Sequence, residues 1–133
     1  MAKDLDAIKA WCAKAVVTLI EPHEFDLLAI PNLGTEVRSR DMEWLHLPIR
    51  DVSTPSAEFN ANWPTYSRRL REMLDRGENV LVHCRGGLGR AGMVSARLLV
   101  DSGVSPDEAL KRVRTVRPGA IETRKQEQWV ASD

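Results

Sequence analysis

The sequence predicts a single α/β domain with a mostly parallel central sheet and helices on both faces. Short apolar stretches rich in Val, Leu and Ile alternate along the chain with longer segments of helical periodicity. That alternation is typical of a parallel sheet, because each strand returns to the next through a crossover helix. At 133 residues, with 43% hydrophobic and 29% charged residues, the chain fits one domain over residues 1–133.

Two helices and two strands are expected in the first part of the chain. A first amphipathic helix is indicated by apolar residues that share one face: Leu5, Ile8, Trp11, Cys12 and Ala15. The β-branched stretch 15–20 predicts a buried strand, and 24–30 predicts a short helix that ends before Pro31. Residues 43–49 predict a second strand, with Pro48 marking an edge or a strand end.

A turn-rich loop and a long helix follow. Residues 50–56 have no apolar periodicity and are rich in turn formers. The next helix is indicated by apolar residues three or four positions apart: Phe59, Trp63, Tyr66, Leu70 and Met73. Gly77 is placed to cap this helix, and 79–83 forms a compact strand.

The last part of the chain predicts three helices. Residues 91–101 favour a helix, with Gly103 as its C-terminal cap. Ser105 then acts as the N-cap of a second helix, which the breaker segment 117–119 ends. Residues 122–131 form the final helix.

Charge and composition exclude some classes of function. Lys plus Arg and Asp plus Glu are each 19, so the formal net charge is zero, which argues against binding to nucleic acid or membranes. No stretch is long and apolar enough to span a bilayer, and the N-terminus lacks a signal-peptide core. Two cysteines make no disulfide framework, so we expect a cytoplasmic protein whose thiols stay reduced.

The segment VHCRGGLGRAG, residues 82–92, carries the chemistry. Cys84 is followed by five residues and then by Arg90, and three glycines between them let the backbone curl with its amides pointing inward. The helix that follows adds its positive N-terminal end, and Arg90 can hold two phosphate oxygens with its planar fork. The expected phosphate-binding residues are Arg85, Gly86, Gly87, Leu88, Gly89 and Arg90.

These surroundings assign roles to the neighbouring side chains. Positive charge favours the thiolate, so Cys84 is expected to attack phosphorus directly, with His83 orienting the loop rather than acting as a base. The leaving oxygen then needs an acid, and Asp51 in the 50–56 loop is the best candidate. Gln126 is expected to orient the water that hydrolyses the cysteinyl-phosphate. Asp26 and Asp41 are weaker candidates for the acid.

At this point the sequence resembles a known family. The stretches HCRGGLGR (83–90), LPIRD (47–51) and RPGAIET (117–123), the last shortly before Gln126, resemble the dual-specificity branch of the cysteine-based protein tyrosine phosphatases. Within that branch the likeness is greatest to the kinase-associated phosphatase group and its bacterial relatives, over about 5–130. The resemblance implies hydrolysis of phosphotyrosine, and of phosphoserine or phosphothreonine, in a phosphorylated protein or peptide, without a metal or cofactor.

The sequence departs from the family pattern in three places. Ala91 stands where the family has a serine or threonine whose hydroxyl stabilises the departing thiolate, so breakdown of the phospho-enzyme is expected to be slower. The family usually begins with one or two more strands, so we expect a smaller sheet or a chain that lacks that segment. The short chain leaves no room for pocket-deepening loops, so we expect a shallow pocket.

Other interpretations stay open. A phosphate-binding adaptor with little turnover is one alternative, and a phosphatase of phosphoinositides or RNA 5′ ends is another. Arg85, Arg124 and Lys125 extend the positive mouth or are simply solvated. We expect Cys12 to pack against the sheet. No metal is expected, because neither His23 nor His46 has acidic or cysteine partners at ligand spacing. The sequence does not fix the oligomeric state.

Overall fold

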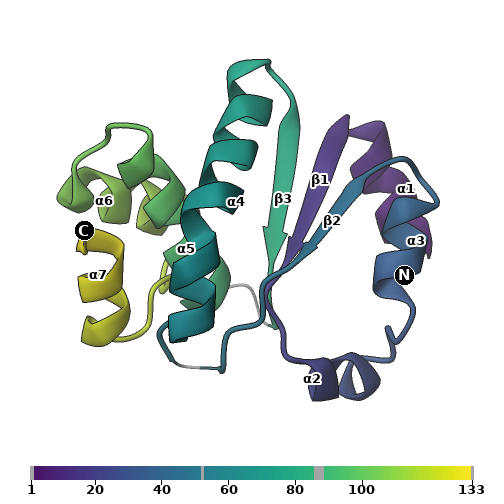
Figure 1. The fold of residues 1–133 in the computed structure, drawn as a ribbon, viewed down its shortest axis with the longest axis horizontal. Coiled ribbons are helices and arrows are strands. Elements are labelled where there is room, and N and C mark those ends of the chain that lie inside the picture. The colour runs from purple at the N-terminus through teal and green to yellow at the C-terminus, as the bar shows by residue number, and fades with distance from the viewer. Residues whose placement is uncertain (1, 52, 86–88, 133) are drawn as a thin grey trace.

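The computed structural model describes residues 2–51, 53–85 and 89–132. Within these residues the chain forms helices and strands in alternation (Figure 1). Their bounds are α1 (Ala2–Ala10), β1 (Ala13–Thr18), α2 (Pro22–Leu27), α3 (Leu33–Arg38), β2 (Glu43–His46), α4 (Ala57–Asp75), β3 (Asn79–His83), α5 (Gly89–Asp101), α6 (Pro106–Val116) and α7 (Arg124–Ala131).

The three strands form one parallel sheet in the order β2-β1-β3. At the end of the central strand β1, Thr18 pairs with His46 of β2 and with His83 of β3. The carboxyl ends of all three strands therefore meet at one edge of the sheet, and α2 lies beside that edge (Figure 1). The predicted α/β fold with a parallel sheet is confirmed.

Helices cover both faces of the sheet, as the sequence predicts (Figure 1). Helices α1 and α3 cover one face, where their apolar side chains form a cluster with the strand residues: Leu5, Ala13, Val16, Leu33, Val37 and Met42. Helices α4 and α5 pack on the other face in a larger core, which α6 and α7 extend. Because side chains alternate along a strand, Val16 and Thr18 point to the α1 side while Ala15 and Val17 enter the larger core.

The largest differences from the sequence prediction lie before β2. Helix α1 ends at Ala10, and Cys12 takes a left-handed φ of 68°, so β1 begins at Ala13, two residues before the predicted start of that strand. Cys12 is exposed, so the expectation that it packs against the sheet is wrong. Helix α3 was not predicted, because Pro31 and Gly34 indicate a break.

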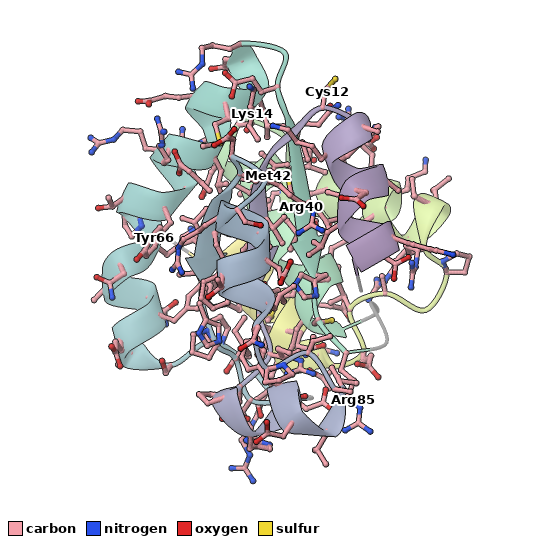
Figure 2. All side chains as sticks on the ribbon, turned by 90° about the vertical axis from the view of Figure 1, so that its right-hand side faces the viewer. Cys12, Lys14, Arg40, Met42, Tyr66 and Arg85 are labelled. Atoms are coloured by element: carbon pink, nitrogen blue, oxygen red, sulfur yellow. The ribbon has the colours of Figure 1, made fainter. Side chains whose placement is uncertain are left out.

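The two cysteines are also far apart. Cys12 precedes β1 and Cys84 follows β3, at opposite ends of a parallel pair of strands. In Figure 2, Cys12 and Arg85, the neighbour of Cys84, lie at opposite ends of the molecule. Both thiols are free.

No helix among the described residues is long and apolar enough to cross a membrane.

Gly34 gives a test of the packing between α3 and the sheet. A Cβ at this position would lie 2.5 Å from Cε3 and Cζ3 of Trp44, although Gly34 lies inside a helix. Helix propensity alone predicts that Gly34→Ala stabilises the protein by about 1 kcal/mol. We expect the opposite, a loss of about 1 to 3 kcal/mol in the free energy of unfolding, because the indole must move.

The measurement is denaturant unfolding in two backgrounds. In a Trp44→Val background the clash is gone, so Gly34→Ala should be neutral or stabilising there. An equal loss in both backgrounds would show that the indole is not the cause.

Candidate active site

Cys84 lies where β3 ends, at the carboxyl edge of the sheet. Its Sγ accepts a hydrogen bond from the backbone N–H of Ala91, at 3.3 Å, in the first turn of α5. The start of α5 therefore faces the sulfur, as expected for an anion-binding site at a helix N-terminus. Of the expected phosphate-binding residues, Gly86, Gly87 and Leu88 lie outside the described residues.

Arg90 is buried and is held by a carboxylate that the sequence analysis did not identify. Only 1% of Arg90 is exposed, and 3% of Glu24. Nη1 donates to Oε2 of Glu24 at 2.8 Å and Nη2 donates to Oε1 at 3.0 Å, so the pair is bidentate. Nη1 also donates to the carbonyl of Ile49 at 3.1 Å, in the segment after β2.

This ion pair sets the charge state of both groups. Hydrogen bonding to Arg90 holds the pKa of Glu24 below its ordinary value of 4.5, although burial opposes this. Burial alone would lower the pKa of Arg90, but hydrogen bonding to Glu24 and the charges of Glu24, Asp51 and Cys84 together raise it above its ordinary value. Glu24 therefore stays anionic and Arg90 stays cationic in the interior.

One edge of the Arg90 guanidinium is left open. Among the described residues, Nε of Arg90 is the buried side-chain nitrogen or oxygen atom that lacks a hydrogen-bond partner. Glu24 occupies the edge formed by the two terminal nitrogens, so the edge formed by Nε and Nη2 remains for an anion. A buried donor without a partner is costly unless a ligand satisfies it.

Asp51 lies beside this open edge. Its Oδ1 is 3.5 Å from Nη2 of Arg90, and its side chain is 58% exposed. A hollow of about 580 Å³ opens here, lined by Glu21, His23, Glu24, Arg50, Asp51 and Arg85. The weaker candidates lie elsewhere: Asp26 is exposed on α2, and Asp41 precedes β2 at the amino end of the sheet.

Gln126 is fully buried and links α7 to the Asp51 loop. Its Nε2 donates to the carbonyl of Ser53 at 3.1 Å, while its Oε1 accepts from the backbone N–H groups of Glu122 and Thr123. A Cβ at Gly89 would collide with the carboxylate of Glu122, so the start of α5 and the start of α7 are packed closely. Gln126 thus holds the loop in place in this structure, and its role toward water stays a prediction.

The ring of His83 forms a hydrogen bond with Thr18 on the neighbouring strand β1. Its Nε2 lies 2.7 Å from Oγ1 of Thr18, which also accepts a hydrogen bond from Nε1 of Trp44 at 2.8 Å. Burial lowers the pKa of His83 from its ordinary value of 6.5, so the ring is neutral at pH 7.

Some of the exposed basic residues lie at the hollow beside Asp51, and others lie away from it. Arg85 and Arg50 are exposed at the hollow next to Asp51, whereas Arg124 lines a different hollow with Asp107. Lys125 is exposed on α7.

The expectation that His23 has no acidic partner at metal-ligand spacing is wrong. Ligand atoms of Glu21, His23 and Glu24 lie within 4.8 Å of one another. Both oxygens of Glu24 are already bonded to Arg90, so this cluster gives no support for a metal site.

Glu24→Gln tests the buried ion pair. Loss of the carboxylate leaves the guanidinium charge of Arg90 in the interior, so we expect about 3 kcal/mol less stability at pH 7 and weaker binding of inorganic phosphate. Glu108→Gln is the matched control, because Glu108 forms an exposed pair with Arg112 and should cost less than about 1 kcal/mol.

The pH dependence of this difference has a definite sign. The folded-state pKa of Glu24 lies below 4.5, so its stabilisation is complete above that pH and is lost as the pH falls through the folded-state value. Wild type and Glu24→Gln should therefore converge in unfolding free energy as the pH falls below 4.5 and through the folded-state pKa of Glu24. A constant difference down to acid pH would contradict this assignment.

Comparisons with known proteins agree with the geometry. A family model described as "PTP-SAK: Swiss Army Knife protein, DSP-PTPase phosphatase domain" matches residues 3–130. Cyclin-dependent kinase inhibitor 3 of Rattus norvegicus is 32% identical over 127 residues, which cover 93% of this chain and 58% of the relative. The chain thus spans little more than half the length of this curated relative.

Solved structures show the same fold. The active form of Tk-PTP is 40% identical with a TM-score of 0.79, and the match covers 96% of this chain and 82% of that chain. A kinase associated phosphatase whose catalytic-site cysteine is replaced by serine is 29% identical with a TM-score of 0.86. That match covers 97% of this chain and 72% of that chain. The parallel sheet, the Cys84 loop and the match over 3–130 lead to one conclusion: this chain belongs to the family of dual-specificity and tyrosine phosphatase (DSP-PTPase) domains.

Proposed function

We propose that this protein hydrolyses phosphate monoesters of phosphotyrosine, and of phosphoserine or phosphothreonine, in proteins, through a cysteinyl-phosphate intermediate. The observation that carries the proposal is the open edge of Arg90, which is buried and has no partner at Nε within the described part of the chain, next to the Ala91 amide that donates to the sulfur of Cys84. In this arrangement the thiol of Cys84 can attack the phosphorus of the same phosphate group whose oxygens the Arg90 guanidinium binds.

The proposed reaction has two steps. In the first, Sγ of Cys84 bonds to phosphorus as the ester P–O bond breaks, and Asp51 gives its proton to the leaving oxygen. Arg90 and the loop amides hold the three non-bridging oxygens. In the second, a water oxygen attacks phosphorus, its proton passes to Asp51, and the thiolate leaves.

The second step is where Ala91 matters. A serine or threonine hydroxyl at this position would donate to the departing sulfur, and here the backbone N–H of Ala91 is the donor, at 3.3 Å. We infer that one amide gives less stabilisation than an amide and a hydroxyl together, so the phospho-enzyme should break down slowly.

The proposed substrate is a phosphorylated protein or peptide. Arg50 and Arg85 are exposed at the hollow beside Asp51, where they can contact acidic groups near the phosphate. We also propose a cytoplasmic location, because a reducing compartment keeps Cys84 available for attack.

Cys84→Ser tests the nucleophile. It should lower kcat on an aryl phosphate, measured with a chelator present, by about a thousandfold or more, because serine has no thiolate. Phosphate binding should persist, since Arg90 and the loop amides remain. Cys12→Ser is the matched control and should keep wild-type kcat, since Cys12 is exposed beyond the far end of the sheet.

Substantial activity in Cys84→Ser would show that the nucleophile is another group. A single burst of product without steady turnover in the wild-type protein would instead favour the adaptor alternative. A substrate panel of phosphopeptides, a phosphoinositide and a 5′-phosphorylated RNA separates the proposed substrate class from the others.

Asp51→Asn tests the acid. An amide cannot give a proton, so kcat/KM should fall by about a hundredfold for leaving groups that need protonation and by much less for nitrophenolate. Asp41→Asn should leave both rates near wild type, because Asp41 lies at the opposite edge of the sheet. Equal losses for good and poor leaving groups would show that Asp51 is not the acid.

A further inference from the structure

A line of polar side chains crosses the sheet on the face covered by α1 and α3. Trp44 comes from β2, Thr18 from β1 and His83 from β3, and Thr18 pairs directly with His83 in the register of the sheet. Thr18 is fully buried, and its hydroxyl lies 2.8 Å from the indole nitrogen of Trp44 and 2.7 Å from Nε2 of His83. Trp44, Thr18 and His83 thus form a hydrogen-bonded chain across the sheet, the cross-sheet relay.

The direction of each hydrogen bond follows from the chemistry of the groups. An indole N–H only donates, so Oγ1 of Thr18 accepts from Trp44. Within the described residues Thr18 Oγ1 has these two partners, so the acceptor available for its own proton is Nε2 of His83. Oγ1 has two lone pairs and could also accept from a protonated Nε2, but the buried hydroxyl proton of Thr18 would then have no acceptor, which is costly. This cost favours an unprotonated Nε2 and places the ring proton of His83 on Nδ1.

Trp44 is itself held firmly in place. Its ring lies against Gly34, stacks on His46 with centroids 5.1 Å apart, and has the guanidinium of Arg38 at 5.1 Å from its centroid. The indole therefore has little freedom to turn its N–H away from Thr18. The donor at one end of the relay is fixed by packing, not by a polar contact of its own.

We propose that Trp44 and Thr18 are positioning residues that hold His83 as the neutral Nδ1–H tautomer directly before the nucleophile. The inference rests on the proposed role of Cys84, since it concerns the residue that precedes the nucleophile and the strand end from which the phosphate loop starts. The backbone carbonyl of His83 also accepts from the N–H of Leu19 at 3.0 Å, so β1 fixes both the backbone and the ring of this residue.

Other charged groups near His83 do not replace the relay. Asp4 of α1 lines a hollow that His83 shares on one side, and Arg112 and Arg117 line a hollow that it shares on the other. Burial is the cause of the low pKa of His83, with no charge partner contributing. The proton position on the ring is therefore set by the hydroxyl of Thr18.

His46 provides an internal reference for the test. Its Nε2 lies 2.8 Å from the carbonyl of Ile20, which only accepts, so Nε2 of His46 carries a proton. Nitrogen-15 NMR of the imidazole rings should thus show opposite tautomers for His46 and His83 near pH 7. A protonated Nε2 on His83 would overturn the proposal.

Trp44→Phe is the main variant, because it keeps an aromatic ring on Gly34 and removes the donor. Without the indole N–H no second donor competes for Oγ1 of Thr18, so this oxygen accepts more readily from a protonated Nε2, and the pKa of His83 should rise by about half to one pH unit in the NMR titration. Thr18→Val should also remove the tautomer preference of His83, whereas Thr18→Ser, which keeps the hydroxyl, should retain it. An unchanged tautomer and pKa in folded Trp44→Phe or Thr18→Val would overturn the proposal.

Kinetics then separate positioning from general loss of stability. Trp44→Phe should lower kcat/KM by about threefold to tenfold in the wild-type background and should cause no further loss in a His83→Gln background. Equal losses in both backgrounds would show that Trp44 does not act through His83. The tautomer is also measured in Cys84→Ser, so an error in the nucleophile leaves this result untouched.

Discussion

The ion pair between Arg90 and Glu24 is the constraint on which the site depends. A guanidinium that is 1% exposed requires a carboxylate, and the bidentate geometry leaves its remaining edge for the proposed phosphate. The same side chain bonds to the carbonyl of Ile49 and approaches Asp51. One buried cation therefore joins the segment after β1, the segment after β2 and the first turn of α5.

The parallel sheet makes this convergence possible. Because β1, β2 and β3 run in one direction, the segments that follow them leave from the same edge, with Glu24 after β1, Asp51 after β2 and Cys84 after β3. The contact of Gln126 with Ser53 fixes the Asp51 segment from the side of α7. The cross-sheet relay does the same for the end of β3, through side chains instead of loops.

Much of this arrangement could be predicted from the sequence. The fold class follows from the alternation of strands and helices, and the 83–90 motif places Cys84 and Arg90 together because their spacing is fixed by the loop itself. Glu24 was missed because its local sequence is that of a helix start, and its partner lies far along the chain. Gln126 could have been a surface residue on sequence alone, and its complete burial depends on the packing of α7.

The separation of the site's partners along the chain has a consequence for how the protein acquires its reactivity. The contacts Thr18–His83, Glu24–Arg90 and Ser53–Gln126 join residues 65, 66 and 73 positions apart in a chain of 133. Each of these contacts closes a long loop, which costs conformational entropy and slows folding. A growing polypeptide on the ribosome would carry Cys84 before α7 exists to fix the Asp51 segment. Assembly of the proposed site thus depends on complete folding, because a partly unfolded molecule holds Cys84 apart from Arg90, Glu24 and Asp51.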